Sequence, residues 1–278
     1  MRIFNVYAND HTLSIALALV MCFAVLGPAA GQPSDDEPTA AKGHPIHDST
    51  QADVTDPSVI LTQTQFIYWT GRDSGAEGDS ETFLFQPVIP LSKKNVLRPA
   101  LPFLATAEPD RVTGIGDLFV LDLWITNLAH SSWGIGPAGS LPIATEDGLG
   151  TGKFSLGPAA LYMWKGVPRN LFGIIGYNQT SVAGDSDRAD VNVLSLQPIW
   201  VLHFKWGYMG WTDLSMTFDW ENDGSYTIPV GLRFGKVLKG KTPYNLAIQP
   251  YYEIRDDAPN GWGMKLMAAV VYPNLFTH

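Results

Sequence analysis

The 278-residue sequence has little charge, a single cysteine and few long apolar runs. Only 16% of its residues are charged, and the net charge of −9 excludes a nucleic-acid partner, because phosphate binding requires a basic surface. The only long apolar run covers residues 13–27. No later segment can therefore cross a bilayer as a helix, since a spanning helix needs about 20 apolar residues. With nine tryptophans and so little charge, a membrane protein of this composition has to be a β-barrel.

The N-terminus has the pattern of a secretory signal. Arg2 precedes the apolar run, and the small residues Ala29 and Gly31 suit the −3 and −1 positions of signal peptidase. The pattern predicts a signal peptide over residues 1–31, cleaved after Gly31. An uncleaved anchor or a buried helix is the alternative.

Residues 32–57 are polar, acidic and contain proline, without an apolar period. This composition predicts a flexible periplasmic linker that folding does not require. His44 and His47 have a spacing that could suit a metal ion, but the segment offers no rigid scaffold. We therefore expect no metal and no cofactor.

Residues 58–278 alternate between apolar and polar side chains. In WTDLSMTFDW, Leu214, Met216, Phe218 and Trp220 share one parity, which indicates a strand. The alternation predicts strands near 59–70, 81–91, 98–106, 115–126, 132–143, 153–164, 171–181, 191–203, 211–220, 226–236, 244–254 and 261–271. The expected fold is all-β, a transmembrane antiparallel up-and-down β-barrel of about twelve strands.

The connections between these strands alternate in charge. Those after odd-numbered strands contain Asp or Glu, as in ENDG and RDDAPNG, whereas those after even-numbered strands are basic or neutral, as in LSKKNVLRPA and KVLKGKTP. Alternate connections of an up-and-down barrel lie at opposite ends, so one end is acidic and the other basic. Outer-membrane lipid and lipopolysaccharide, bridged to the acidic end by divalent cations, are the expected partners.

Five segments resemble a known family: GIGDLFVLDLW, WGIGPAGSLPIATEDGLGTGKFSLGPAALYMW, SLQPIW, TIPVGLRFGKV and QPYYEI. Across residues 114–273 the sequence is similar to bacterial outer-membrane proteins named for transport in the MetA pathway of phenol degradation, which often also carry the name neuromedin U. The resemblance implies a porin-type barrel in the bacterial outer membrane.

No motif indicates catalysis. GIGPAG, residues 134–139, matches a dinucleotide fingerprint in letters, but Pro137 and the absence of a following helix predict a strand instead. GLGTGKF, residues 148–154, lacks the first glycine and the Ser or Thr of a phosphate loop. His130 and His203 are not in a nucleophile motif, so an enzyme, such as a barrel hydrolase, is the weakest of the readings.

The polar parity of the strands predicts the lining of the lumen. Its predicted members are Asp122, Trp124, Gln197, His203, Asp213, Asp219, Arg233, Tyr251, Glu253 and Lys265. Opposed charges across the bore would orient polar solutes, and the aromatic rings would contact apolar ones. We expect passive transport of small, apolar or aromatic solutes. The alternatives are charges that pair and plug the barrel, or a closed barrel that serves adhesion or envelope structure.

The parities also predict a register for one hairpin. If apolar residues share the outer face, a five-residue loop over 221–225 places Asp213 opposite Arg233 in the lumen. The predicted pairs are Trp220 with Tyr226, Phe218 with Ile228, Met216 with Val230, and Leu214 with Leu232. Pro229 opposes this register, because a proline in a central strand usually forces a bulge.

Overall fold

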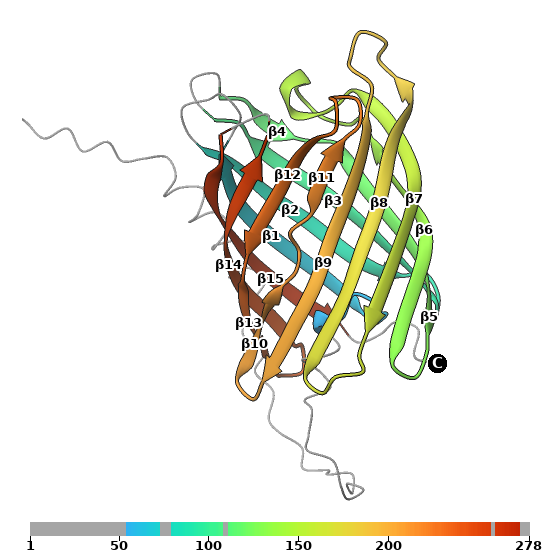
Figure 1. Ribbon diagram of the computed structural model, residues 1–278, viewed down its shortest axis with the longest axis vertical. Helices are drawn as coiled ribbons and strands as arrows, with labels where there is room; N and C mark the ends of the chain where they lie inside the picture. The colour runs from blue at the N-terminus through green and yellow to red at the C-terminus, as the bar shows by residue number, and fades with distance from the viewer. Residues whose placement is uncertain (1–53, 73–78, 108–110, 257–258, 273–278) are drawn as a thin grey trace, which may run out of the picture. The chain divides into compact units, whose positions relative to one another are not determined.

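The strands of this chain form a closed ring (Figure 1). A computed structural model describes residues 54–72, 79–107, 111–256 and 259–272. Within them β1 (Thr62–Arg72) pairs with the next strand along the chain and, at the closure, with the last, β15 (Gly261–Tyr272). Every pairing is antiparallel, so the fold is an up-and-down β-barrel.

Between β1 and β15 the remaining strand segments follow in chain order. They are β2 (Asp79–Pro90), β3 (Asn95–Ala105), β4 (Thr113–Ile115), β5 (Leu118–Asn127), β6 (Ser131–Leu141), β7 (Lys153–Trp164), β8 (Asn170–Gly184), β9 (Asn192–Phe204), β10 (Gly207–Trp211), β11 (Met216–Asp219), β12 (Ser225–Gly231), β13 (Arg233–Leu238) and β14 (Tyr244–Arg255). Because β4 with β5, β10 with β11, and β12 with β13 are each one interrupted span, the described residues form twelve spans. The predicted fold class and strand count are confirmed.

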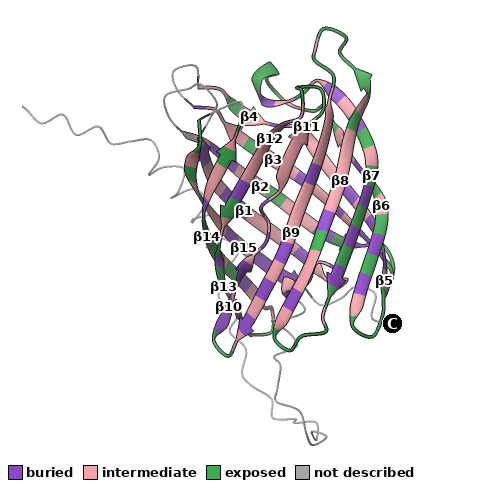
Figure 2. Cartoon of the chain, viewed as in Figure 1, coloured by how far each residue is buried: buried purple, intermediate pink, exposed green. Residues whose placement is uncertain are grey.

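Side chains alternate between the outer surface and the interior along each span. On β7, Leu156, Tyr162 and Trp164 are exposed on the outside, whereas Leu161 and Met163 are buried inside. Figure 2 shows the same alternation of buried and exposed residues on β6 and β7. The period-two pattern therefore produces an apolar outer wall, as lipid contact requires.

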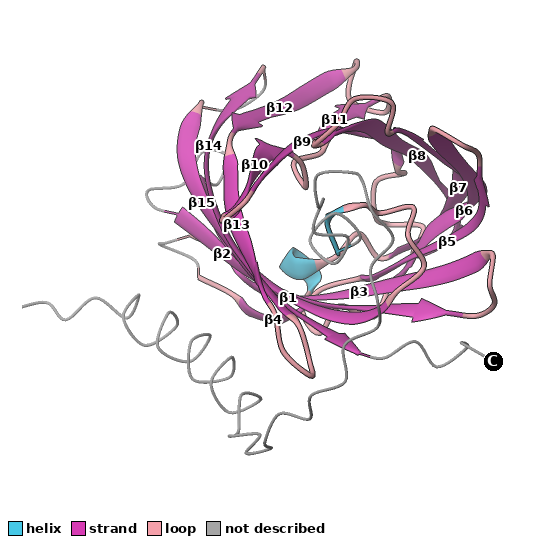
Figure 3. Ribbon diagram, turned by 90° about the horizontal axis from the view of Figure 1, so that it is seen from below, coloured by secondary structure: helices cyan, strands magenta, loops and turns pink. Residues whose placement is uncertain are grey.

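The interior is apolar at the end where β1 begins, which is the end with the basic connections. Inward side chains there form one cluster, comprising Val88, Val96, Leu121, Leu123, Ile125, Ala138, Ala159, Leu161, Met163, Leu171, Ile175, Ile199, Val201, Tyr208, Val237 and Val271. Val54 belongs to this cluster, and Ile60 and Leu61 pack against it. Figure 3 shows the strands as a ring, and the burial of Val54 in the cluster places the short helical turn at residues 54 and 55 inside it.

This burial corrects the predicted boundary of the linker. Asp56 and Val54 are buried although they fall within residues 32–57, which the composition predicted to be flexible. Residues of the barrel form hydrogen bonds and an ion pair with the polar groups of residues 54–57. Local composition alone does not reveal these distant partners. The signal peptide and residues 32–53 lie outside the described residues.

Residues 134–139 belong to strand β6, as predicted in place of a nucleotide loop. Glycine is needed there because of close backbone approach. A Cβ on Gly136 would lie 1.8 Å from the backbone oxygen of Asp122 on the neighbouring β5. No side chain fits in that space.

The predicted hairpin register is wrong by two residues. Phe218 pairs with Tyr226, and the loop covers residues 220–224 instead of 221–225. In this loop, which is also five residues long, Asp223 and Gly224 both adopt positive φ, and Asp219 accepts a hydrogen bond from the Glu221 amide.

The two strands of this hairpin are also interrupted, where the prediction assumed continuous pairing. Residues 212–215 separate β10 from β11, and Leu232 separates β12 from β13. Pro229 lies in this region and is paired with Glu253 of β14. The register with β14 continues through Pro229 without a shift, so the bulge expected at this proline does not occur there.

We predict that Gly136→Ala destabilises the barrel, because a methyl group would overlap the Asp122 carbonyl and force β5 and β6 apart. Overpacking of this kind costs about 1–3 kcal/mol or more. The free energy of unfolding in detergent, followed by tryptophan fluorescence in a urea series, measures the loss. Gly148→Ala is the matched control, since a Cβ there meets nothing within 4 Å. Equal stability of the two variants would contradict the close approach.

Candidate lumen site

A cavity of about 500 Å³ lies inside the barrel, bounded on one side by the N-terminal segment. Six predicted lumen residues line it: Gln197, Asp213, Arg233, Tyr251, Glu253 and Lys265. His203 and Asp219 also lie on the inward parity of their strands but not on the cavity wall. His203 contacts the N-terminal segment, and Asp219 caps the 220–224 loop.

Two predicted lumen residues face outward instead. Trp124 is 51% exposed on the outer wall, and Asp122 shares its parity, whereas Leu121 and Leu123 face the interior. The prediction placed the polar face of this strand inside. Here the interior is the apolar cluster, so β5 presents apolar residues inward and the Asp122 carboxylate outward, where Asn95 donates to it at 2.6 Å.

The charged part of the cavity wall is built around Asp213. Arg233 Nη1 donates to Asp213 Oδ2, which is the ion pair that the hairpin analysis predicted. Gln197 donates to the other carboxylate oxygen at 3.2 Å, and Lys265 Nζ donates to the Asp213 backbone oxygen at 2.5 Å. Two cations therefore contact one residue, Arg233 at its carboxylate and Lys265 at its backbone oxygen.

The pair forms despite the shifted register because residues 212–215 depart from the regular sheet. Asp213 adopts a φ of 57°, an uncommon conformation for a residue other than glycine. Leu214 is buried, and Gln249 Nε2 donates to the Thr212 oxygen at 2.9 Å. These contacts stabilise the segment in a position from which Asp213 reaches Arg233.

Charges elsewhere on the wall pair locally and not across the bore. The Glu253 carboxylate accepts a hydrogen bond from Arg255 on the same strand, two residues further on. Tyr251 donates to the Thr70 backbone oxygen at 2.5 Å. Ion pairs between neighbouring residues therefore replace the predicted field of opposed charges across the bore. The charge that faces the cavity is concentrated at Asp213, Arg233 and Lys265.

An apolar aromatic surface lines another part of the cavity. The rings of Phe119 on β5 and Tyr177 on β8 lie with centroids 5.0 Å apart, next to Leu121 and Ile175. Trp69 of β1 is beside Lys265, whose Nζ lies 5.2 Å from the ring centroid. The sequence analysis missed these rings, because β1 alternates weakly and the assigned parity of β5 was reversed.

The N-terminal segment is fastened to the interior at the basic end by an ion pair. Lys165 Nζ, in the connection between β7 and β8, lies 2.6 Å from Asp56 Oδ2. Lys165 also donates to the Ser58 hydroxyl at 3.0 Å, and the Ser58 amide and hydroxyl both donate to Asp56. We call residues 54–61 the plug segment, since they occupy the interior beside the apolar cluster.

Two further contacts hold the plug segment. Arg98, buried on β3, donates to the Pro57 oxygen at 3.0 Å. His203 Nε2 lies 2.7 Å from the Thr55 hydroxyl, while His203 Nδ1 lies 3.2 Å from the Arg169 carbonyl. Because a carbonyl can only accept, Nδ1 carries the proton and Nε2 accepts from Thr55. His203 is thus a residue that anchors the plug segment.

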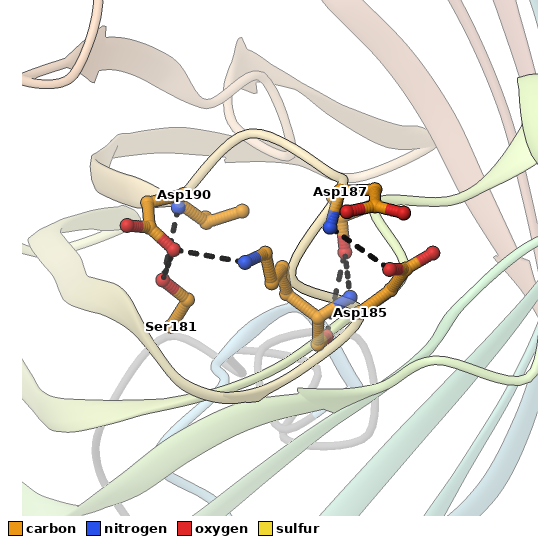
Figure 4. Close-up of polar contacts among 7 residues, drawn as sticks. Ser181, Asp185, Asp187 and Asp190 are labelled. Atoms are coloured by element: carbon orange, nitrogen blue, oxygen red, sulfur yellow. Dashed lines mark hydrogen bonds and ion pairs between the residues drawn. The ribbon is translucent and has the colours of Figure 1, made fainter.

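At the acidic end, the connection between β8 and β9 is fixed by charge. Lys153 and the Ser181 hydroxyl both donate to Asp190 Oδ1, at 3.0 and 3.2 Å (Figure 4). These hydrogen bonds, together with the positive charge of Lys153, lower the pKa of the Asp190 carboxyl. The same connection is tightened by the Asp187 amide, which donates to Asp185 at 2.9 Å. Asp190 is therefore ionised at neutral pH, and the anchor weakens only as the pH falls through that lowered pKa.

No helix among the described residues is long and apolar enough to cross a bilayer. The same residues contain no group of three or more His, Cys, Asp or Glu side chains placed to hold a metal ion.

Comparison with known proteins supports the fold. No family model matches the chain, and no curated protein is similar to it. Among solved structures, an outer membrane channel from Pseudomonas putida F1 is similar with a TM-score of 0.55 at 14% identity, over 77% of this chain and 96% of that one. At this identity the likeness establishes the barrel fold.

We predict that Lys165→Met loosens the plug segment. Removal of the ammonium leaves the Asp56 carboxylate, which is 6% exposed, without its ion-pair partner, so local opening becomes more favourable. Amide hydrogen exchange at residues 58 and 59 should accelerate about tenfold or more. Lys93→Met removes an exposed lysine from another connection at the same end and should have no effect. Unchanged exchange in Lys165→Met would show that the ion pair does not fasten the segment.

Proposed function

We propose that this protein is an outer-membrane channel that conducts small solutes passively through its lumen. The observation that carries the proposal is a closed twelve-span barrel with an apolar outer wall and a polar cavity inside. A soluble barrel would bury its apolar residues inside and expose polar ones. Here large apolar side chains such as Trp133, Leu156 and Ile248 are exposed on the outside, which favours lipid as the surrounding solvent.

The plug segment and the apolar cluster narrow the basic end of the lumen. Passage then requires displacement of residues 54–61, which are held by a few polar contacts and not by a strand ladder. The channel is consequently gated at this end. The Pseudomonas channel of similar fold supports the proposal, and the resemblance to the phenol-degradation family favours apolar or aromatic solutes.

A closed barrel serving envelope structure is the second candidate, because the plug segment and apolar cluster fill part of the interior. We do not propose an enzyme, since His203 anchors the plug segment through Thr55 and Arg169.

We predict that the purified protein produces ion current in planar bilayers and that Lys165→Met increases the open fraction, because the plug segment is less firmly held. Lys93→Met should behave as wild type. Folding of each variant is checked by its shifted mobility on unheated gels. Absence of current from folded wild type and Lys165→Met alike would favour the closed structural barrel.

We also propose that the acidic end faces outward, where its carboxylates bind lipopolysaccharide through divalent cations. Two observations support this orientation. The connections alternate in charge, and the start of β1 and the end of β15 lie together at the basic end, opposite the acidic one. Cysteine in place of Asn222 should react with an impermeant maleimide on whole cells, and cysteine in place of Gly240 should not. Labelling of the Gly240 site alone would reverse the orientation.

A further inference from the structure

Two charged groups on the cavity wall, Lys265 and Arg98, donate to backbone oxygens, and Arg98 is occupied by the Pro57 oxygen of the plug segment. Glu253 is paired with Arg255, Arg233 with Asp213, and Asp117 accepts the Thr151 amide and hydroxyl at 2.7 and 2.9 Å. Lys265 contacts a backbone oxygen and the face of Trp69, and within the described part of the chain it forms no ion pair with a carboxylate.

The Asp213 group therefore carries excess positive charge. Arg233 and Lys265 both contact Asp213, whose single carboxylate is bonded to Arg233 and Gln197, whereas Lys265 contacts the backbone oxygen. A cation on a confined wall is stabilised by any anion that reaches it, because the local dielectric is lower than in water. Lys265 can donate further hydrogen bonds, since an ammonium has three donors and the backbone oxygen uses one.

The apolar aromatic surface lies across the cavity from this cation. Three spans, β1, β2 and β3, lie between β15, with Lys265, and β5, with Phe119, and β8, with Tyr177, lies further round the ring. The wall thus offers positive charge on one side and the Phe119 and Tyr177 rings on the other, within a cavity of about 500 Å³. A molecule that matches both sides has an anionic end and a compact apolar body.

We propose that the lumen binds small aromatic carboxylates, with the carboxylate on Lys265 and the ring against Phe119 and Tyr177. The inference deepens the proposed channel function, on which it rests, by naming the solute class. A neutral aromatic molecule would meet only half of the site. An aromatic cation would be repelled by Lys265 and Arg233, which outnumber the single carboxylate of Asp213.

Binding to the full-length protein in detergent tests the solute class independently of conduction. Three probes share one ring and differ in charge: benzoate, benzamide and benzylammonium. Calorimetric titration should show benzoate binding at least about tenfold more tightly than the other two, since a charge-assisted hydrogen bond is about twice as strong as a neutral one. Benzylammonium binding as tightly as benzoate would overturn the proposal.

Substitution identifies the group responsible. Lys265→Gln should weaken benzoate binding about tenfold or more while leaving benzamide unchanged, and Lys265→Arg should retain most of the benzoate affinity because it keeps the charge. Lys205→Gln, which removes an exposed lysine from the connection between β9 and β10, is the matched control. Retained benzoate affinity in folded Lys265→Gln would overturn the proposal. If Lys265→Gln does not fold, the rescue by Lys265→Arg decides the matter in its place.

Current measurements separate this inference from the channel proposal. In a potassium benzoate gradient, wild type should favour the anion and Lys265→Gln should lose that preference. Current without anion preference would refute the aromatic-carboxylate site and leave the channel intact. Lysine-dependent benzoate binding without current in any folded variant would refute the channel and leave the site intact.

Discussion

Closure of the sheet by the pairing of β1 with β15 is the constraint on which the rest of the structure depends. A closed sheet has no edge strand, so every span has two neighbours and its backbone polar groups are paired within the barrel. The outer wall can then be uniformly apolar without exposing backbone donors to lipid. Since successive side chains alternate, the same strands must present their other residues to an enclosed space, and the composition of that space becomes the decisive feature of the molecule.

That enclosed space is divided along its length. At the basic end it is a packed apolar cluster that includes Val54 of the plug segment, and further along it is a polar cavity. The strands are interrupted at residues 212–215 and at Leu232. These breaks allow backbone and side chains to move inward, which brings Asp213 to Arg233 and Lys265. Residues 212–215 thus give up pairing within the sheet, and the same segment supplies Asp213 to the charged wall.

The plug segment and the charged wall give the proposed channel two separate elements. In that proposal the plug segment, fastened through Asp56 and Lys165, controls passage at one end, and Lys265 and the aromatic rings form the solute site in the cavity. Gln197 of β9 belongs to the charged wall, since it donates to Asp213. Passage and selection can therefore be altered by different substitutions.

Several properties were predictable from the sequence by itself. The apolar and polar alternation determines the strands because its period is a property of the extended backbone, and the alternating charge of the connections determines their count. The Asp213 and Arg233 pair also followed from parity, although its register did not. The contact survived the error in register because residues 212–215 leave the regular sheet and bring Asp213 to Arg233.

Only the tertiary structure decided which face of β5 is inner and where the chain before β1 lies. Both faces of β5 carry apolar residues, because its inner face contributes to the apolar cluster and its outer face meets the exterior. A rule that places charge inside therefore misplaced Asp122 and Trp124. Likewise, the polar residues 54–58 resemble a solvated linker until the barrel supplies Lys165, Arg98 and His203 as partners. Local patterns determine conformation along the chain, whereas burial depends on groups that are distant in the sequence and meet only after the barrel has closed.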